Sequence, residues 1–374
     1  MKVMVGLSGG VDSAVATYLL QQQGCDVVCA FMRNWDAMAN NDILGNPTIA
    51  DSQCPQEKDY EDAKEVARIL GVKLHRIDFI KEYWNDVFSL FIDEYNLGRT
   101  PNPDILCNKF IKFDAFLKYA KANGCGMIAM GHYAKKVEIN GHTFLAKCAD
   151  QNKDQTYFLS QLNEEQIKSC LFPLGDIKKD EVRMIARKLH LNIAEKKDST
   201  GVCFIGERDF REFLKNYIPA QRGDIVDIET GRVLGKHDGV LYYTLGQRKG
   251  LGIGGIPHEK AIGWFVCKKD VKRNILYVAK GEENAYLYSD RCLVNHLNFI
   301  VPLSGSVHVG CKFRYRQADQ GATIKILKKD CVEVLYDKPY KAVTPGQEAV
   351  FYDGEILIGS GTIDEVFFQG HKIE

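Results

Sequence analysis

The chain has 374 residues, of which 45% are apolar and 26% are charged, with 33 glycines and 10 prolines. This is longer than one ordinary core supports, and the composition is that of a globular protein, so we expect two or three domains. The 49 basic and 49 acidic side chains balance, so any binding of nucleic acid has to come from local basic patches and not from overall charge.

The twelve cysteines form no CxxC pair and have no regular spacing, in a chain far longer than a disulfide-stapled module. The first residues, "MKVMVGLSGG", lack the features of a signal or transit peptide. No apolar run reaches the roughly 18 to 20 residues of a membrane span. These observations predict a protein of a reducing, bacterial-type cytoplasm, with thiol cysteines and no membrane contact.

Apolar strands alternate with amphipathic helices over the first 130 residues. The patterns predict strands over residues 2–7, 26–32, 72–79 and 126–132. They predict helices directly after "SGGVDS" and over residues 59–71, 80–95 and 109–122. This alternation indicates an α/β domain with a doubly wound parallel sheet.

The pattern changes further along the chain. "KVEINGHTFLAKC" predicts a hairpin around Asn140 and Gly141, and residues 180–189 and 208–217 predict helices. From about Gly223, short strand-and-turn runs are typical of small β-barrels. We therefore predict a catalytic domain over residues 1–206, a small central linker-like domain over 207–278 and a C-terminal β-barrel over 279–374.

A glycine-rich turn joins the first strand to its helix. "GLSGGVDS" places two glycines and two serines where backbone N–H groups and the helix dipole favour an anion. The turn has neither the Gly-Lys-Ser/Thr of a Walker A loop nor the GxGxxG pattern. Taken alone, an ordinary strand–turn–helix junction capped by Ser13 or Asp12 stays open beside a phosphate site.

Two cysteines stand apart from the apolar strand patterns. Cys107, in "TPNPDILCNKFIKF", comes at or just before a predicted helix N-terminus, where the dipole favours a thiolate. Asp104 lies three residues upstream, within reach for proton exchange. Cys203 follows the turn "DSTG" on a predicted loop, where a thiol is accessible. On position alone, a buried packing role for Cys107 stays open.

The motifs taken together resemble a known family. "SGGVDS" resembles the PP-loop of ATP pyrophosphatases, which cleave ATP between the α and β phosphates. With "NPDILCN", "MGHYA", "KDQTYFLSQL", "STGVCFIGERDFREFL", "YTLGQRKGLGIGG" and "KFRYRQ", the chain resembles the tRNA-specific 2-thiouridylases over essentially its whole length. This implies a PP-loop domain of the adenine nucleotide α-hydrolase-like type, and an ATP site formed by Gly6, Leu7, Ser8, Gly9, Gly10, Val11, Asp12, Ser13, Met32 and Gly131.

The resemblance also implies the chemistry. ATP would activate the C2 oxygen of uridine 34 in tRNA, with Mg²⁺ expected to neutralise the phosphates. Cys203 would carry sulfur as a persulfide and Cys107 would act as nucleophile, with Asp104 as acid or base. Whether freed sulfide or the persulfide itself attacks C2 stays open. A persulfide donor, either a cysteine desulfurase or a relay protein, would be a partner beside the tRNA.

The family pattern further implies contacts with the tRNA or its target base. They fall at Asn102, Pro103, Asp104, His132, Lys153, Asp154, Gln155, Arg314, Tyr315 and Gln347. "KFRYRQ" would be a strand with basic groups on one face and aromatic rings on the other, and a solvated edge strand stays open beside RNA contact. "YTLGQRKGLGIGG" is either a hinge or a backbone surface for RNA.

Two other functions are weighed against thiolation. A PP-loop ligase or amidotransferase acting on a small metabolite would explain "SGGVDS" but leaves Cys107 and Cys203 unused. A non-catalytic RNA-binding or sulfur-carrier protein would tolerate the loss of ATP binding. Dependence of ATP turnover on tRNA distinguishes these alternatives.

Overall fold

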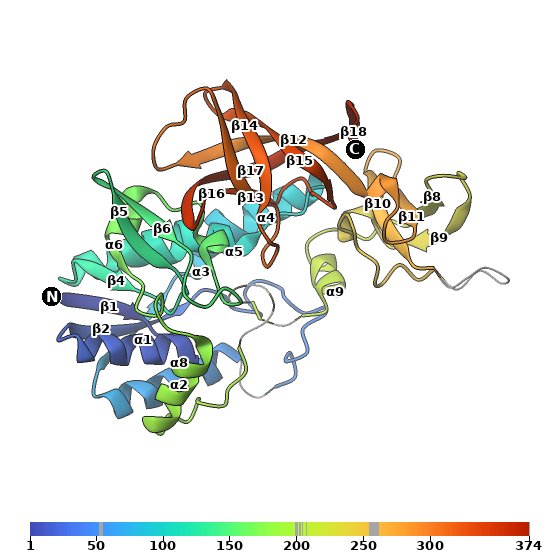
Figure 1. Cartoon of the computed structure of the whole chain (residues 1–374). Coiled ribbons are helices and arrows are strands. Elements are labelled where there is room, and N and C mark those ends of the chain that lie inside the picture. The colour runs from blue at the N-terminus through green and yellow to red at the C-terminus, as the bar shows by residue number, and fades with distance from the viewer. Residues whose placement is uncertain are drawn as a thin grey trace.

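A sheet of five strands, all parallel, organises the N-terminal part of the chain (Figure 1). The computed structural model describes residues 1–51, 55–198, 201, 203, 205–206, 208–253 and 262–373. In sheet order the strands are β3 (Lys73–Asp78), β2 (Asp26–Arg33), β1 (Lys2–Gly6), β4 (Met127–Ala129) and β7 (Cys170–Leu171).

Helices cover both faces of this sheet, as the alternation of strands and helices predicts. One face carries α1 (Val11–Gln22), α2 (Pro55–Leu70) and α8 (Lys179–Lys188). The other carries α3 (Ile80–Tyr83), the π-helical η1 (Trp84–Phe88), α4 (Ser89–Asn96), α5 (Pro103–Leu106), the π-helical η2 (Cys107–Ala115) and α6 (Phe116–Ala122). Val3 and Val5 of β1 pack on the first face and Met4 on the second, because successive side chains of a strand point to opposite faces.

A smaller four-stranded sheet forms the central part of the chain. Its order is β10 (Trp264–Asp270), β11 (Ile275–Lys280), β8 (Gly223–Asp227) and β9 (Val233–His237). Two short helical elements flank it, α9 (Phe210–Lys215) and η4 (Val240–Tyr242). In Figure 1 this part lies to one side, joined to the N-terminal domain through the segment that carries α9.

The C-terminal part is a closed six-stranded barrel, because β12 pairs with both β15 and β17. Around the barrel the strands are β12 (Tyr288–Phe299), β15 (Cys331–Lys341), β14 (Gln320–Lys328), β13 (Ser306–Lys312), β16 (Glu348–Asp353) and β17 (Ile356–Phe368). The turn η5 (Ala285–Leu287) precedes the barrel, and β18 (His371–Ile373) pairs with β17.

A hairpin of the N-terminal part extends the barrel sheet. It consists of β5 (Lys135–Ile139) and β6 (His142–Ala146), and β6 pairs with the start of β17. Two short elements follow it in the chain, η3 (Thr156–Leu159) and α7 (Glu164–Lys168). The main-chain hydrogen bonds of this pairing join the N-terminal part to the barrel.

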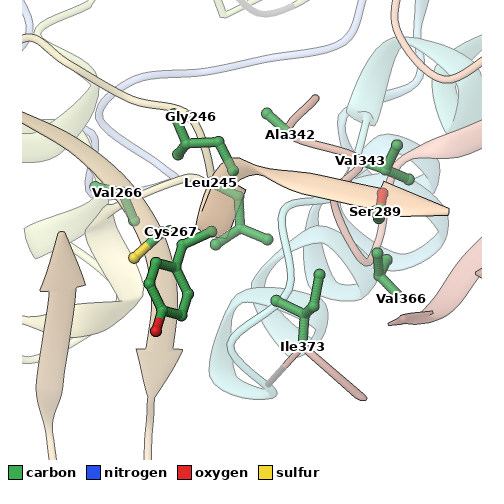
Figure 2. A pocket seen from close by; sticks show the side chains of 11 residues that line it. Leu245, Gly246, Val266, Cys267, Ser289, Ala342, Val343, Val366 and Ile373 are labelled. Atoms are coloured by element: carbon green, nitrogen blue, oxygen red, sulfur yellow. The ribbon is translucent and has the colours of Figure 1, made fainter. Parts of the chain in front are cut away.

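The central sheet and the barrel also pack on each other. Figure 2 shows side chains from both parts, among them Leu245, Val343 and Val366, around a pocket at this contact. The pocket holds about 10 Å³, room for roughly one water molecule, so it is a packing gap and not a ligand site.

The predicted fold class, an α/β domain with a parallel sheet followed by a small central domain and a β-barrel, is confirmed. Two local predictions are wrong. The helix predicted over residues 109–122 begins at Pro103 and not at Lys109. "KFRYRQ" is not a strand, since β13 ends at Lys312 and the chain turns, with Arg316 at a φ of +66°.

Candidate active site

A cavity of about 830 Å³ opens at the carboxyl ends of β1, β2 and β4. From β1 the chain builds the sheet first to one side, through β2 and β3, and then to the other side with β4. Open α/β sheets bind ligands at this switch point, between β1 and β4. Among the predicted site residues, those that line the cavity are Gly6, Leu7, Ser8, Gly10, Val11, Asp12, Ser13, Met32, Asp104, Gly131, His132, Lys153, Gln155, Cys203 and Tyr315.

The glycine-rich turn leads directly into the N-terminus of α1. Gly9 has a φ of +74°, and a Cβ there would lie 2.2 Å from the carbonyl oxygen of Asp59, so only glycine fits. Ser13 Oγ accepts a hydrogen bond from Ser8 N at 3.2 Å and donates to Gly10 O at 3.0 Å. Gly10 offers no side-chain cap to α1. The N–H groups of the first helical turn therefore remain open toward the cavity and suit phosphate.

The loop after β4 packs directly on this turn. A Cβ at Gly131 would lie 2.7 Å from Ser13 N, so the backbone of that loop reaches the start of α1. Met130 and Met32 line the cavity beside Gly6. Together they give the cavity an apolar wall next to its phosphate-type turn, as a purine nucleotide requires.

A network of charged groups supports the turn from outside the motif. Asp12 accepts hydrogen bonds from Tyr133 Oη at 2.8 Å and from Lys179 Nζ at 2.7 Å. Lys179 also pairs with Asp198, as does Lys153. Burial works against ionisation of Asp198, but the hydrogen bonds from Lys153 and Lys179 outweigh it and lower its pKa to about 2. Lys153 is thereby fixed at the cavity wall.

The two singled-out cysteines meet beside this turn. Cys107 Sγ lies 3.7 Å from Cys203 Sγ, although 96 residues separate them in the chain. Asp104 Oδ1 accepts a hydrogen bond from Cys203 N at 3.0 Å, and Tyr83 Oη donates to Cys203 O at 2.8 Å. Cys203 lines the cavity, whereas Cys107 is fully buried behind it.

The thiolate form is favoured at Cys203 and not at Cys107, contrary to the expectation from the position of Cys107 near a helix N-terminus. Cys107 lies in the second turn of a helix that Asn102 caps, so the predicted benefit of the helix N-terminus is lost and burial raises its pKa. The hydrogen bond from Cys107 and the charge of Lys112 lower the pKa of Cys203. Burial raises the pKa of Asp104, so this carboxyl takes up a proton more readily than an exposed aspartate does.

Lys112 is a residue that sequence reasoning missed. It lines the cavity, and Cys203, Cys107 and Asp104 raise its pKa although burial acts in the opposite direction. Lys112 lies five residues after Cys107, but nothing in "NKFIK" shows that a π-helical turn brings the two side chains together. Its ammonium is the cation that stabilises a sulfur anion at Cys203.

Replacing Lys112 by methionine is expected to raise the pKa of Cys203. Alkylation of Cys203 by iodoacetamide, followed by peptide mass spectrometry across pH, measures this change. In the unaltered protein the rate should reach half its plateau below the ordinary cysteine pKa, and the Lys112→Met profile should shift upward, slowing the reaction about tenfold at pH 7. Lys118→Met is the control, because that side chain is 74% exposed. Coinciding profiles for Lys112→Met and the unaltered protein would contradict this role.

Several predicted base or tRNA contacts do not line the cavity. The Asn102 side chain accepts from Asp104 N as a helix cap, with Pro103 in the first turn. Asp154 is buried and accepts hydrogen bonds from Cys148 N and the Thr156 hydroxyl, so its carboxylate is directed inward. At the barrel, Arg314 donates to Leu245 O and Thr344 Oγ1, and Gln347 Nε2 donates to Thr100 O. These last residues join parts of the chain in the structure.

Other cavity residues lie outside every predicted set. Lys196 Nζ donates to Gly9 O at 3.0 Å and pairs with Asp59 and Asp62, which brings positive charge to the glycine-rich turn. Phe158 packs its ring 4.3 Å from that of Tyr315, and both rings line the cavity. Asn108 also lines it. Parts of "STGVCFIGERDF" and of "GLGIGG" lie outside the described residues.

The described residues contain no group of three or more His, Cys, Asp or Glu side chains able to hold a metal ion. A Mg²⁺ that accompanies a nucleotide is commonly held by phosphates and one or two carboxylates, so such a group is not required. Among the helices in the described part of the chain, none is long and apolar enough to cross a membrane.

Comparison with known proteins decides the family. Residues 1–207 match the family model described as the tRNA methyl transferase HUP domain, residues 211–280 its PRC-barrel domain and residues 289–363 an aminomethyltransferase β-barrel domain. The chain is 56% identical to a tRNA-specific 2-thiouridylase of Mycoplasma capricolum, with 98% of this chain and 99% of the relative covered. The chain belongs to the tRNA-specific 2-thiouridylases.

Three further similarities, two to relatives and one to a solved structure, accompany this match. Identity is 52% to the 2-thiouridylase of Acholeplasma laidlawii, covering 99% of this chain and 98% of the relative, and 46% to that of Bacillus cytotoxicus, covering 100% and 97%. A 4-thiouridine synthetase solved with RNA and ATP has a TM-score of 0.33 and 14% identity, over 56% of this chain and 45% of that one. Membership confirms the predicted family and the enzyme class, a tRNA-uridine 2-sulfurtransferase.

Proposed function

We propose that this chain uses ATP to replace the C2 oxygen of the wobble uridine of tRNA by sulfur, giving 2-thiouridine, AMP and diphosphate. One observation carries the proposal. The sulfur atoms of Cys107 and Cys203 lie 3.7 Å apart at a cavity that the glycine-rich turn also lines. A nucleotide site and a cysteine pair in one cavity are what activation followed by sulfur transfer requires.

Activation comes first, because the C2 carbonyl of uridine is a weak electrophile with a poor leaving group. The N–H groups at the start of α1 would hold the phosphates of ATP, and Met32 and Gly131 would bound the adenosine. The C2 oxygen would attack the α-phosphate, releasing diphosphate and leaving AMP on the base. Asp104 would take the proton lost from the base, and Mg²⁺ would neutralise phosphate charge.

Sulfur transfer would follow from Cys203. This cysteine lines the cavity and has the lower pKa, so it is suited to receive sulfur from a donor as a persulfide. In one route Cys107 attacks Cys203 Sγ, a Cys107–Cys203 disulfide forms, and the released hydrosulfide displaces AMP at C2. In the other, the terminal persulfide sulfur displaces AMP, and Cys107 then frees the base by the same attack on Cys203 Sγ. A reductant restores both thiols.

Both routes require that Cys107 reach Cys203 Sγ from the side opposite the substrate. The buried position of Cys107 behind the cavity wall supports this direction of attack. A separation of 3.7 Å closes to a disulfide bond of about 2.05 Å by a small side-chain movement.

A stacked wobble base has to leave the anticodon loop to reach this cavity. Tyr315 and Phe158 would offer it aromatic surface, and Lys153 and Arg316, which also line the cavity, would contact phosphate. We also propose a cytoplasmic location, where tRNA is present and thiols are kept reduced.

The test supplies the protein with unmodified tRNA, ATP, Mg²⁺, cysteine and a cysteine desulfurase. We expect 2-thiouridine in the digested tRNA, with AMP release that depends on tRNA. AMP release without tRNA and without 2-thiouridine would favour a ligase acting on a small metabolite. Binding of tRNA with no turnover of ATP would favour an RNA-binding or sulfur-carrier protein.

A further inference from the structure

Asn108, the residue after Cys107, belongs to the wall of the cavity beside Asp104 and Cys203. Its side chain is only 2% exposed. A buried amide in the wall of a substrate cavity has to satisfy its donors and acceptors locally or through the ligand, because water does not reach it freely.

One hydrogen bond fixes how this amide is oriented. Asn108 Nδ2 donates to the backbone oxygen of Phe158 at 2.8 Å. A carbonyl oxygen only accepts, so the NH₂ group has to face Phe158 and the amide cannot be flipped without loss. Within the described part of the chain, the remaining atom, Oδ1, is buried and has no hydrogen-bond partner. An acceptor left in this state costs free energy that a ligand N–H would recover.

The proposed substrate presents such a group. Uracil has one N–H on its pairing edge, at N3, between the carbonyls at C2 and C4. Cytosine keeps the C2 carbonyl but has a bare acceptor at N3, which would oppose Oδ1. Lys112, four residues after Asn108 in the same helix, also lines the cavity and offers a donor for a carbonyl.

We infer that Asn108 Oδ1 accepts a hydrogen bond from uracil N3–H and makes the site select uridine against cytidine. The inference rests on the proposed function, since it concerns the base admitted to that cavity. The hydrogen bond forms as the base binds, before Asp104 takes the N3 proton, so Asn108 selects the base and takes no part in sulfur transfer.

The test compares two tRNA substrates that differ only in uridine or cytidine at position 34. Formation of 2-thiouridine and 2-thiocytidine gives kcat/KM for each. The unaltered protein should prefer uridine by about tenfold or more, and Asn108→Leu, which keeps the approximate volume without the acceptor, should lower that preference about tenfold. Asn85→Leu is the matched control, because that asparagine is exposed on η1.

The ratio of two substrates on one preparation separates selectivity from folding. If Asn108→Leu gives no turnover, the affinities of Cys203→Ser and Cys203→Ser/Asn108→Leu for the two anticodon stem-loops replace the rates. An unchanged preference in the variant, by either measurement, would overturn the inference and show that Oδ1 does not contact the base. No thiolation by the unaltered protein on either tRNA would instead reject the proposed function.

Discussion

Replacing Cys203 or Cys107 by serine is expected to lower the rate of 2-thiouridine formation by a factor on the order of 10⁴, the size of loss seen when a nucleophile is removed. A serine hydroxyl neither carries a persulfide nor forms a disulfide, so each change stops the proposed sulfur transfer at its own step. Both substitutions leave the glycine-rich turn unchanged, so diphosphate release in the presence of tRNA should continue, and AMP should be released only where sulfur still reaches C2. Single-turnover assays by mass spectrometry measure both products.

The Cys107→Ser variant also distinguishes the two routes of sulfur transfer. If released sulfide attacks C2, this variant should accumulate a Cys203 that carries one extra sulfur atom and no RNA. If the persulfide attacks C2 directly, Cys203 should become linked to the tRNA through sulfur, since Cys107 is absent to break that link. Cys203→Ser should give neither species.

Cys125→Ser is the matched control for this pair. Cys125 is 1% exposed, like the fully buried Cys107, but it lies between α6 and β4, and its Sγ donates to Asn123 O and not to Cys203. Its replacement should leave thiolation within about twofold of the unaltered rate, because it is outside the proposed chemistry. Full activity of both Cys107→Ser and Cys203→Ser would reject the sulfur-transfer mechanism but would not contradict the proposed nucleotide site.

The parallel sheet was predictable because its information is local. β1 and β2 are short apolar runs bounded by polar or glycine-rich turns, and α2 ends at Leu70 just before Gly71. The pairing of β6 with β17 was not predictable, since nothing near residue 145 indicates a partner beyond residue 355. Strand patterns identify strands, but they do not name partners that lie far along the chain.

The two wrong local predictions have separate physical causes. The start of a helix at Pro103 has a signal in the sequence, an asparagine cap followed by proline, but the π-helical segment after it breaks the 3.6-residue repeat by which helices are recognised. "KFRYRQ" alternates as a strand does, yet the sheet ends at Lys312 and the chain turns at Arg316.

The parts of the site that one continuous sequence motif supplies were predictable. The glycine-rich turn is one continuous stretch, whereas its support by Lys179 comes from a side chain 167 positions after Asp12. Asn108 and Lys112 lie inside the quoted motif around Cys107, but a sequence does not show which of its polar side chains face a cavity. The meeting of Cys107 and Cys203 followed from the resemblance, and their order of acidity came from burial and Lys112.

Replacing Asp42 by alanine is expected to lower the free energy of unfolding by about 3 to 5 kcal/mol, because it leaves a buried guanidinium without its carboxylate. Asp42 and Arg208 pair at 2.9 Å with side-chain exposures of 0% and 5%. Trp35 Nε1 also donates to Asp42, at 3.0 Å. The pair joins the irregular segment after β2 to the segment after Cys203, and Trp35 and Arg208 both line the cavity. Urea unfolding followed by tryptophan fluorescence measures the loss.

An exposed ion pair of the same kind provides the comparison. Arg187 and Glu195 pair at 2.7 Å with exposures of 54% and 74%, so Glu195→Ala should leave the free energy of unfolding nearly unchanged. Each substitution removes one carboxylate from an arginine, and the difference between them measures the burial of the Asp42–Arg208 pair together with the loss of the Trp35 hydrogen bond. An equal effect of Asp42→Ala and Glu195→Ala on the free energy of unfolding would show that the Asp42–Arg208 pair does not hold the two segments together. A large cost accompanied by a raised KM for ATP would show that the same contact keeps the nucleotide side of the cavity in place, since Trp35 donates to Asp42 and lines the cavity together with Met32.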